Sequence, residues 1–297
     1  MSYGIIYMGS KSDIAKNIMR LLPKSTNLYD LFGGGFAFTH AAILHNKSTN
    51  YFFNEIKPDV VALIQDAIAG KYSYSNFLPS FISREEFFKT KDTNAYVRLL
   101  WSFGNNQKDY LFSKELEPLK RSLHNAVVFD IFDETAIRVL KISKWPFGIT
   151  NITQKRLCSR YLTGKHKGAE QLQQLQRLER FERLEQLQQL RPNLFFSSLD
   201  YREVSIQNDS IVYCDPPYAN TETYLNKTEF NSHDFWQWAR AQQFPLFISE
   251  YTIPNDFVVI GKYNRKTKLS AIGRIKTKAE LFACNKIAHN MFFKEKP

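Results

Sequence analysis

The sequence predicts an α/β fold: a mainly parallel sheet whose strands come from both ends of the chain, with a mainly helical module inserted between them. Short apolar runs followed by glycine or proline turns, which are typical of buried parallel strands, occur before residue 60 and after residue 192. From Pro58 to Pro192 the chain is more polar and lacks strand alternation. We therefore expect one discontinuous domain of residues 1–60 and 193–297, and an inserted module of residues 61–192.

The first βα unit lies near the N-terminus. Asp13–Leu22 is predicted to be a helix that stops before Pro23. The apolar run Leu28–Phe32 has the pattern of a central strand, and Gly33, Gly34 and Gly35 follow it directly, before a predicted helix over Phe36–His45. Glycines at such a turn let a ligand approach the backbone closely, although any tight turn would also use them.

A second strand, Tyr51–Phe53, ends in Asn54 and Glu55. The acidic residue follows the glycines by about 20 residues, where nucleoside-binding sheets place an acceptor for ribose hydroxyl groups. The glycine loop and Glu55 together therefore favour a nucleoside-like ligand.

The middle of the chain contains two further predicted helices. One covers Asp92–Phe103, with Asp92 as its N-cap, and the other covers Phe112–Leu123. Between them lies a polar loop that includes Asn105, Asn106 and Lys108. Amide side chains can bind adenine edges in DNA, but such loops more often simply turn the chain.

A Leu/Gln-rich repeat occupies residues 170–191, with an apolar residue at every third position: Leu172, Leu175, Leu178, Phe181, Leu184, Leu187 and Leu190. On an α-helix each step of three residues falls about 60° short of a full turn, so the stripe winds around the helix and a regular coiled coil is disfavoured. Three structures remain open: a helix buried by different neighbours along its length, stacked turns, or a mobile insertion.

The C-terminal part again predicts strands. The expected strands are Phe195–Leu199, Ile211–Cys214, Leu246–Ile248, Phe257–Ile260 and Leu281–Ala283, with a helix over Phe235–Gln242. The sheet should be mainly parallel in its middle.

Asp215-Pro216-Pro217-Tyr218 follows the Ile211–Cys214 strand directly. Its two prolines fix the loop and leave backbone carbonyls without N–H groups. Ligands bind at strand ends in open α/β sheets. A carboxylate, rigid carbonyls and an aromatic ring suit a planar ring that carries an amino group, as a nucleobase does.

Composition narrows the class of protein further. The 297-residue chain carries 40 Lys and Arg against 29 Asp and Glu, a net charge of +11, which favours a polyanionic partner. Between Lys262 and Lys278 there are basic residues but no acidic one. This basic run is either a solvated loop or a set of phosphate contacts; its candidate DNA-binding residues are Lys262, Arg265, Lys266 and Lys268.

Other classes of protein are disfavoured. The three cysteines lie far apart and the six histidines show no ligand spacing, so we expect neither a metal site nor a disulfide framework. No apolar run approaches the roughly 18 residues of a membrane span, and the N-terminus lacks the pattern of a secretory signal. We therefore expect a soluble, cytoplasmic protein that does not bind a membrane.

At this point the motifs, taken in order, resemble those of the Dam-like α group of N6-adenine DNA methyltransferases, of the type found in bacteriophages and restriction systems. Tyr7-Met8-Gly9-Ser10-Lys11 resembles the aromatic-x-Gly-Gly-Lys opening of that family, with Ser10 in place of a glycine. Asp30-Leu31-Phe32-Gly33-Gly34-Gly35 is similar to its S-adenosylmethionine loop, with Phe36 where the last glycine is expected. Glu55, Asp200-Tyr201 and the Asp215–Tyr218 turn complete the series.

The resemblance implies a Rossmann-like, S-adenosylmethionine-dependent methyltransferase sheet whose inserted module recognises the target sequence. It implies catalytic roles for Asp215, Pro216, Pro217 and Tyr218. The residues implied to bind the cofactor are Tyr7, Lys11, Asp30, Phe32, Gly33, Gly34, Gly35, Glu55, Asp200, Tyr201 and Asp215. Asp200 is expected beside the adenine of the cofactor. The substrate would be double-stranded DNA in a bacterial or phage-infected cell, and a cognate restriction endonuclease could be a partner.

The implied reaction needs no metal and no covalent enzyme intermediate. Asp215 and the Pro216 carbonyl would accept hydrogen bonds from the two N–H groups of a flipped adenine, so that the lone pair of the nitrogen points at the methyl group. Tyr218 would stack on the base. Two alternatives remain open at this stage. The chain could methylate another planar amine, such as cytosine N4 or RNA adenine, or it could be a DNA-binding relative that has lost catalysis.

Overall fold

A computed structural model describes residues 2–164, 176–217, 230–268 and 275–294. The chain divides into two compact units. The first, called here the sheet unit, consists of residues 1–4, 10–61 and 191–297. The second, called the helical unit, consists of residues 5–9 and 62–190. Each unit is described by itself.

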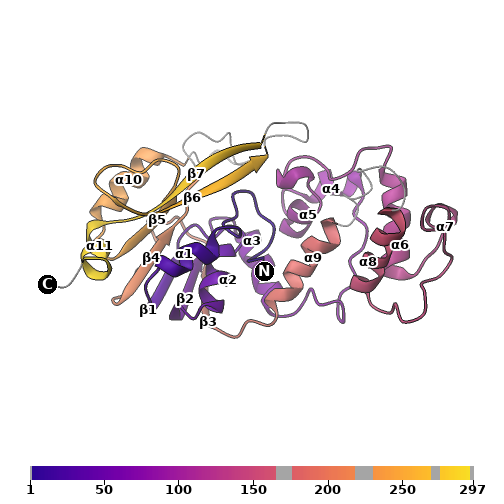
Figure 1. The fold of residues 1–297 in the computed structure, drawn as a ribbon, viewed down its shortest axis with the longest axis horizontal. Helices are drawn as coiled ribbons and strands as arrows, with labels where there is room; N and C mark the ends of the chain where they lie inside the picture. The colour runs from indigo at the N-terminus through magenta and orange to yellow at the C-terminus, as the bar shows by residue number, and fades with distance from the viewer. Residues whose placement is uncertain (1, 165–175, 218–229, 269–274, 295–297) are drawn as a thin grey trace. The chain divides into compact units, whose positions relative to one another are not determined.

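The sheet unit contains a seven-stranded sheet, counted over the described residues, with the strand order β3-β2-β1-β4-β5-β7-β6 (Figure 1). The strands are β1 (Ser25–Asp30), β2 (Ser48–Asn54), β3 (Asn193–Ser197), β4 (Ser210–Cys214), β5 (Leu246–Glu250), β6 (Val258–Lys268) and β7 (Ile275–Cys284). The first five in spatial order pair in parallel, and β7 runs antiparallel to both β5 and β6. The prediction of a sheet that is parallel in its middle is confirmed.

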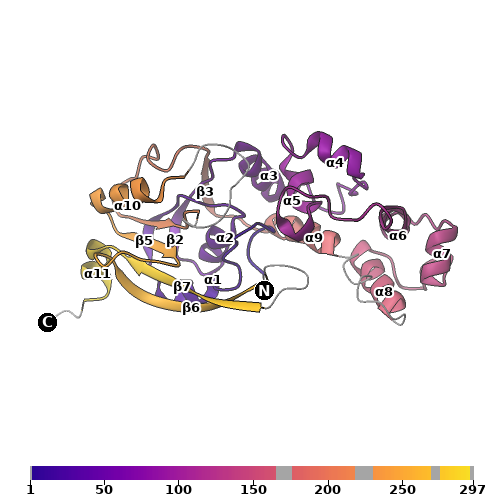
Figure 2. The ribbon, with the colours of Figure 1, turned by 90° about the horizontal axis from the view of Figure 1, so that it is seen from above.

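Helices cover both faces of the sheet. They are α1 (Ala15–Leu21), α2 (Ala37–Leu44), α10 (Ser232–Ala241) and α11 (Lys286–Phe292), while α3 (Pro58–Ile68) leads from the sheet unit into the helical unit. Alternate strand residues supply two apolar layers, as the pleat of a strand requires. Leu28 and Tyr213 pack with α1, α2 and α11, whereas Tyr29 and Val212 pack with α10 on the opposite face (Figure 2).

A sheet with helices on both faces is the α/β arrangement predicted from the sequence, with shifted strand ends. β1 ends at Asp30, two residues before the predicted end, and the two C-terminal strands are much longer than predicted. The basic run therefore lies largely in strands, and the solvated-loop interpretation is wrong for its described residues. β6 and β7 pair continuously from Gly261 to Lys268, with a register shift between Val259 and Gly261.

The helical unit consists of short helices. They are α4 (Arg84–Thr90), α5 (Ala95–Leu100), the 3₁₀ turn η1 (Phe103–Asn105), α6 (Glu117–Phe129), α7 (Glu134–Leu140), α8 (Ile152–Gly164) and α9 (Gln176–Leu187). Asn94 caps α5 by accepting a 3.2 Å hydrogen bond from the Val97 N–H, so Asp92 is not the N-cap. The helix predicted to begin at Phe112 begins at Glu117, because Pro118 suits a first helical turn.

Among its described residues, the Leu/Gln-rich repeat is helical from Gln176 to Leu187, and residues 188–191 lie beyond the end of the helix. Leu172 and Leu175 lie outside the described residues, but Leu178, Phe181, Leu184 and Leu187 are all buried along α9. Leu178 packs against Val127 and Val128, while Phe181 contacts the rings of Tyr72, Tyr74 and Phe77. For the described part of the repeat, the helix buried by different neighbours along its length is therefore the one of the three open structures that is observed.

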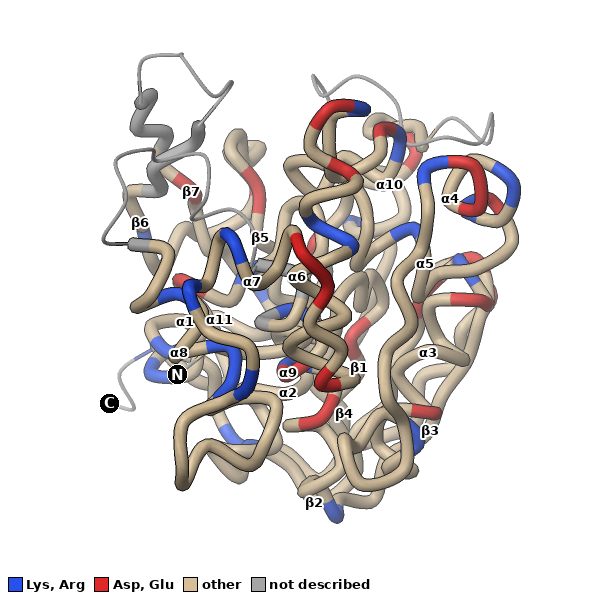
Figure 3. The backbone as a smooth tube through the Cα atoms, turned by 90° about the vertical axis from the view of Figure 1, so that its right-hand side faces the viewer, with Lys and Arg blue, Asp and Glu red and all other residues tan. Residues whose placement is uncertain are grey.

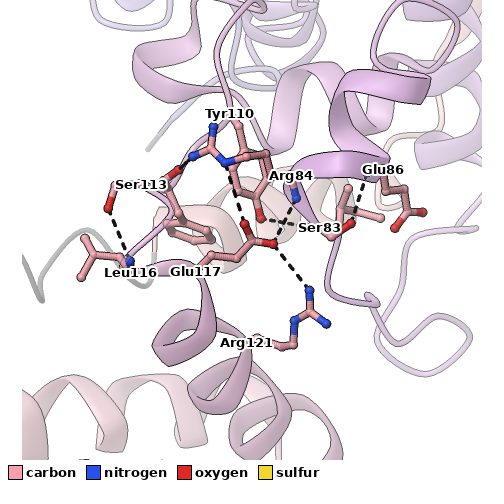
Figure 4. A network of polar contacts seen from close by, with 10 residues as sticks. Ser83, Arg84, Glu86, Tyr110, Ser113, Leu116, Glu117 and Arg121 are labelled. Carbon is pink, nitrogen blue, oxygen red and sulfur yellow. Dashed lines mark hydrogen bonds and ion pairs between the residues drawn. The ribbon is translucent and has the colours of Figure 1, made fainter.

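Acidic and basic residues both occur along α4, which carries Arg84, Glu85, Glu86 and Lys89 (Figure 3). Close by, Glu117 accepts a 3.1 Å hydrogen bond from the Arg84 N–H and pairs with Arg121 at 3.5 Å (Figure 4). Ser83 caps α4 through the Glu86 N–H, at 3.1 Å. These residues line an open hollow of about 610 Å³, which contains none of the predicted site residues.

Candidate active site

Four carboxylates of the sheet unit lie at the ends of neighbouring strands. Asp30 is the last residue of β1, Glu55 follows β2, Asp215 follows β4, and Glu250 is the last residue of β5. These strands are parallel, so their carboxyl ends meet at one edge of the sheet. The fold thereby brings together the glycine loop, the acid at position 55 and the Asp-Pro-Pro turn, as the sequence predicted.

The glycine loop is held tightly between β1 and α2. A Cβ atom on Gly33 would lie 2.0 Å from the ring of Phe53, which is fully buried, so only glycine fits there. Gly34 has a φ of +48°, in the left-handed region that glycine favours. The Gly33 N–H donates to the Asn54 carbonyl at 2.8 Å. The packing of Phe53 and the hydrogen bond to Asn54 therefore fix the loop against the end of β2.

Phe36 occupies the position where the family pattern expects a glycine. It adopts a φ of +67°, so it takes the conformation of a glycine while it caps α2. Its side chain is fully buried and packs edge-on against Phe53, with ring centroids 5.1 Å apart. This packing offsets the cost of about 1–2 kcal/mol for a left-handed residue with a side chain.

Glu55 is oriented by the backbone around it. Its carboxylate accepts hydrogen bonds from the Gly34 N–H at 2.8 Å and the Lys57 N–H at 3.2 Å. Burial raises the pKa of Glu55, and the two backbone hydrogen bonds oppose that change. The glycine loop and the acid, which are 21 residues apart in the sequence, are therefore joined directly.

Asp30 lies beneath the loop and is buried. One carboxylate oxygen accepts a 2.7 Å hydrogen bond from the Thr39 hydroxyl, while Oδ1 has no hydrogen-bond partner among the described residues. Burial raises the pKa of Asp30 to about 7, and the nearby charges of Asp215 and Glu55 act in the same direction. A buried carboxylate oxygen without a partner is costly, which marks this place as suited to a polar ligand.

Asp215 is held by an ion-pair network with two other residues. Lys11, from the loop before α1, donates from Nζ to Oδ1 of Asp215 and also lies 3.0 Å from Oε1 of Glu280 on β7. Lys11 is 3% exposed, Glu280 is fully buried and Asp215 is 18% exposed. Pro216 is buried and Pro217 is partly buried, whereas Tyr218 lies outside the described residues.

Two acidic residues, Glu280 in this network and Glu250 near it, carry no motif in the sequence. Glu280 precedes the predicted strand Leu281–Ala283, and Glu250 ends β5. Burial raises the pKa of Glu250 to about 7; among the nearby charges, Asp215 raises it further and Lys11 opposes the change. A glutamate beside an apolar run in a chain with 29 acidic residues gives no sign of burial, so only the fold reveals these two.

Phe32 and Tyr201, two of the residues predicted to bind the cofactor, form part of an aromatic cluster. The rings of Phe32 and Tyr201 have centroids 5.0 Å apart, and both pack against Phe235 of α10. The carboxylate of Asp200 binds Arg202, with two hydrogen bonds of 2.8 Å. Tyr201 thus contributes to the core beside the site, and Asp200 is already paired with an exposed guanidinium.

The remaining predicted residues belong to the helical unit, lie on β6 or are only partly described. Tyr7 clusters with the helical unit. Asn106 turns its own loop by accepting hydrogen bonds from the Lys108 and Asp109 N–H groups, at 2.9 and 3.0 Å, and Asn105 has a φ of +62°. Lys108 and Lys262 are exposed, and for Arg265, Lys266 and Lys268 only the β6 backbone is described.

Two further properties concern the described residues only. No helix among them is long and apolar enough to cross a membrane. No group of three or more His, Cys, Asp or Glu residues in the described ranges is arranged to hold a metal ion.

Comparison with known proteins identifies the chemistry. Residues 7–249 match the family model described as D12 class N6 adenine-specific DNA methyltransferase. No curated protein sequence matches the chain. The match favours DNA adenine over cytosine N4 or RNA adenine as the methylated group, and an active enzyme over an inactive relative. Because the match covers most of its length and includes the glycine loop, Glu55 and the Asp-Pro-Pro-Tyr turn, the chain belongs to the D12 class N6 adenine-specific DNA methyltransferases.

Proposed function

We propose that the chain methylates the N6 atom of one adenine within a specific sequence of double-stranded DNA, with S-adenosylmethionine as the methyl donor and Asp215 as the central catalytic residue. The observation that supports this proposal best is the position of Asp215. A buried lysine holds its carboxylate at the same strand edge as the glycine loop and Glu55.

The residues at this edge fit the proposed cofactor. Glu55 is a preoriented acceptor for ribose hydroxyl groups, and Oδ1 of Asp30 is a buried acceptor without a partner among the described residues. When bound, S-adenosylmethionine supplies an electrophilic methyl group on a positively charged sulfur. The carboxylates at this edge suit a cation electrostatically.

Asp215 and Pro216 would act on the target amino group. The amino nitrogen of adenine is a weak nucleophile because its lone pair is delocalised into the ring. A carboxylate oxygen of Asp215 and the Pro216 carbonyl would accept hydrogen bonds from its two N–H groups and so localise the lone pair on nitrogen. The proline ring restricts the orientation of this carbonyl. The proton that the methylated nitrogen loses would leave through the hydrogen bond to Asp215. Tyr218 is proposed to stack on the flipped base.

We further propose that residues 61–192 recognise the DNA sequence and that the β6 backbone carries Lys262, Arg265, Lys266 and Lys268 to the phosphates. The net charge of +11 supports a polyanionic substrate. Contacts from Asn105, Asn106 and Lys108, a cognate restriction endonuclease and a cytoplasmic location remain predictions from the sequence.

The first experiment compares Asp215→Ala with the unaltered protein on duplex DNA. Lys11 keeps Glu280 as an ion-pair partner in this variant, so we expect it to fold and to bind DNA. Methyl transfer should fall on the order of 10²- to 10³-fold, as for the loss of one preorganised group. Digestion of the treated DNA to nucleosides should yield N6-methyladenine, and sequencing that reports methylated adenines should show one recurring sequence.

Asp256→Asn is the matched control. Asp256 is an exposed aspartate of the sheet unit that pairs with Arg240 at 2.7 Å, so the substitution also removes one ion pair. It should leave the rate unchanged. Full activity of Asp215→Ala would exclude the proposed role of Asp215, and methyl groups on another base would exclude the substrate.

A further inference from the structure

Lys11 is a buried cation between two carboxylates. Its side chain is 3% exposed, and its ammonium binds Oδ1 of Asp215 and lies 3.0 Å from Oε1 of Glu280, whose side chain is fully buried. A buried ammonium is costly unless it is paired and hydrogen-bonded. One carboxylate would balance its charge. The second leaves the group of three with a net negative charge.

The two carboxylates differ in how firmly the backbone holds them. Asp215 is the first residue of a loop, after the end of β4. Glu280 lies within β7, where its backbone pairs with Tyr263 of β6, and its neighbour Leu281 pairs with Glu250 of β5. The position of Glu280 is therefore set by strands on both sides, while Asp215 lies one residue beyond the end of its strand.

We infer that Glu280 is a positioning residue for methyl transfer: it holds Nζ of Lys11 at the place where Lys11 fixes the carboxylate of Asp215. This inference rests on the proposed role of Asp215. Glu280 touches neither substrate nor cofactor in this scheme and acts through Lys11.

The shared ammonium also preserves the acceptor strength of Asp215. A lysine paired with Asp215 alone would neutralise the carboxylate and weaken its hydrogen bond to the target amino group. Because the same ammonium also faces Glu280, its attraction is divided between two carboxylates. Asp215 then keeps a fixed orientation and a negative charge at the same time, and both are needed to localise the lone pair of the amine.

The test is a double-mutant cycle with Glu280→Gln and Lys11→Met. Glu280→Gln keeps the shape of the side chain and removes its charge. We expect kcat to fall about tenfold or more while the KM values for DNA and S-adenosylmethionine change by less than about threefold. In the Lys11→Met background, Glu280→Gln should cause almost no further loss of rate, because the two residues act as a unit.

Asp256→Asn, which removes a remote ion pair of the same unit, controls for general loss of stability and should not change kcat. Glu280→Asp is the second variant in case Glu280→Gln does not fold. Glu280→Asp keeps the negative charge, but its carboxylate is attached to a side chain that is shorter by one methylene. Lys11 should therefore shift, so that kcat falls while the KM values stay unchanged.

The outcomes are separable. The inference is overturned if kcat is unchanged in Glu280→Gln, or in Glu280→Asp where Glu280→Gln does not fold. It is also overturned if Glu280→Gln causes the same loss of rate with Lys11 present and in the Lys11→Met background. Either result alongside an inactive Asp215→Ala leaves the proposed function intact. Full activity of Asp215→Ala overturns the proposed function itself.

Discussion

Asp30 illustrates how burial changes the chemistry of a single side chain. Its carboxyl is enclosed under the glycine loop, with Thr39 as its hydrogen-bond partner and two other acids nearby. Its pKa in the folded protein is about 7, against 3.8 for an ordinary aspartate. Between these pH values the folded state holds a proton that the unfolded state has released.

The consequence for stability has a defined sign. The contribution of Asp30 to folding is fully present below about pH 4 and is lost as the pH rises through about 7. Asp30→Asn cannot titrate, so its free energy of unfolding, relative to the unaltered protein, should increase from pH 5 to pH 8. Urea denaturation at several pH values measures this difference.

Asp256→Asn is again the control, because hydrogen bonding to Arg240 lowers the pKa of Asp256 and the carboxylate is ionised in both states throughout that range. A difference for Asp30→Asn that stays constant between pH 5 and pH 8 would contradict a buried, protonated Asp30.

At the scale of elements, α9 shows how an unusual sequence period can be buried. A stripe with a period of three winds around a helix, and α9 meets this condition by packing against different residues along its length. Phe181 is central to that packing, since it is 1% exposed and its ring lies 4.7 Å from the Tyr74 ring.

Phe181→Ala should therefore lower the free energy of unfolding by about 3–5 kcal/mol, the usual cost of removing a buried aromatic ring. Gln186→Ala, at an exposed position of the same helix, should change it by less than about 0.5 kcal/mol. Chemical denaturation followed by circular dichroism compares the two. Equal stabilities would show that the stripe is not a packing surface.

The elements also show what a single sequence can predict. Apolar runs identified each parallel strand, because buried strands must be apolar on both faces. The β6 and β7 strands were underestimated, since their outer parts are polar in sequence and their extent follows from the pairing of the two strands with each other. The N-cap of α5 was misplaced by two residues, because Asp92 and Asn94 are equally good caps in isolation.

The site was predictable where its residues lie in motifs and unpredictable where they do not. The glycine loop, Glu55 and Asp215 are adjacent to strand ends in the sequence, and the parallel pairing of the strands brings those ends together. Glu280 lies on an antiparallel strand that inserts beside β5, and no local pattern indicates that its side chain meets Lys11. Such contacts depend on topology and not on spacing.

For the whole molecule, charge is the property most directly linked to the substrate. The chain carries +11 at neutral pH, and the family to which it belongs acts on DNA. Each Lys or Arg that neutralises a phosphate releases a counterion, so affinity for DNA should fall as salt rises. Lys262 is the exposed, described member of the β6 candidates and can be tested alone.

Lys262→Gln should weaken binding to all DNA sequences alike and should reduce the slope of log affinity against log salt by about 0.9, the value for one phosphate contact. Lys286→Gln is the matched control, since Lys286 is equally exposed but begins α11 after the sheet has ended. Fluorescence anisotropy of a labelled duplex, recorded at roughly 50 to 200 mM salt, measures this slope for both variants. If Lys262 contacts a phosphate, only its variant changes the slope; equal slopes for both variants and the unaltered protein would place the DNA away from β6.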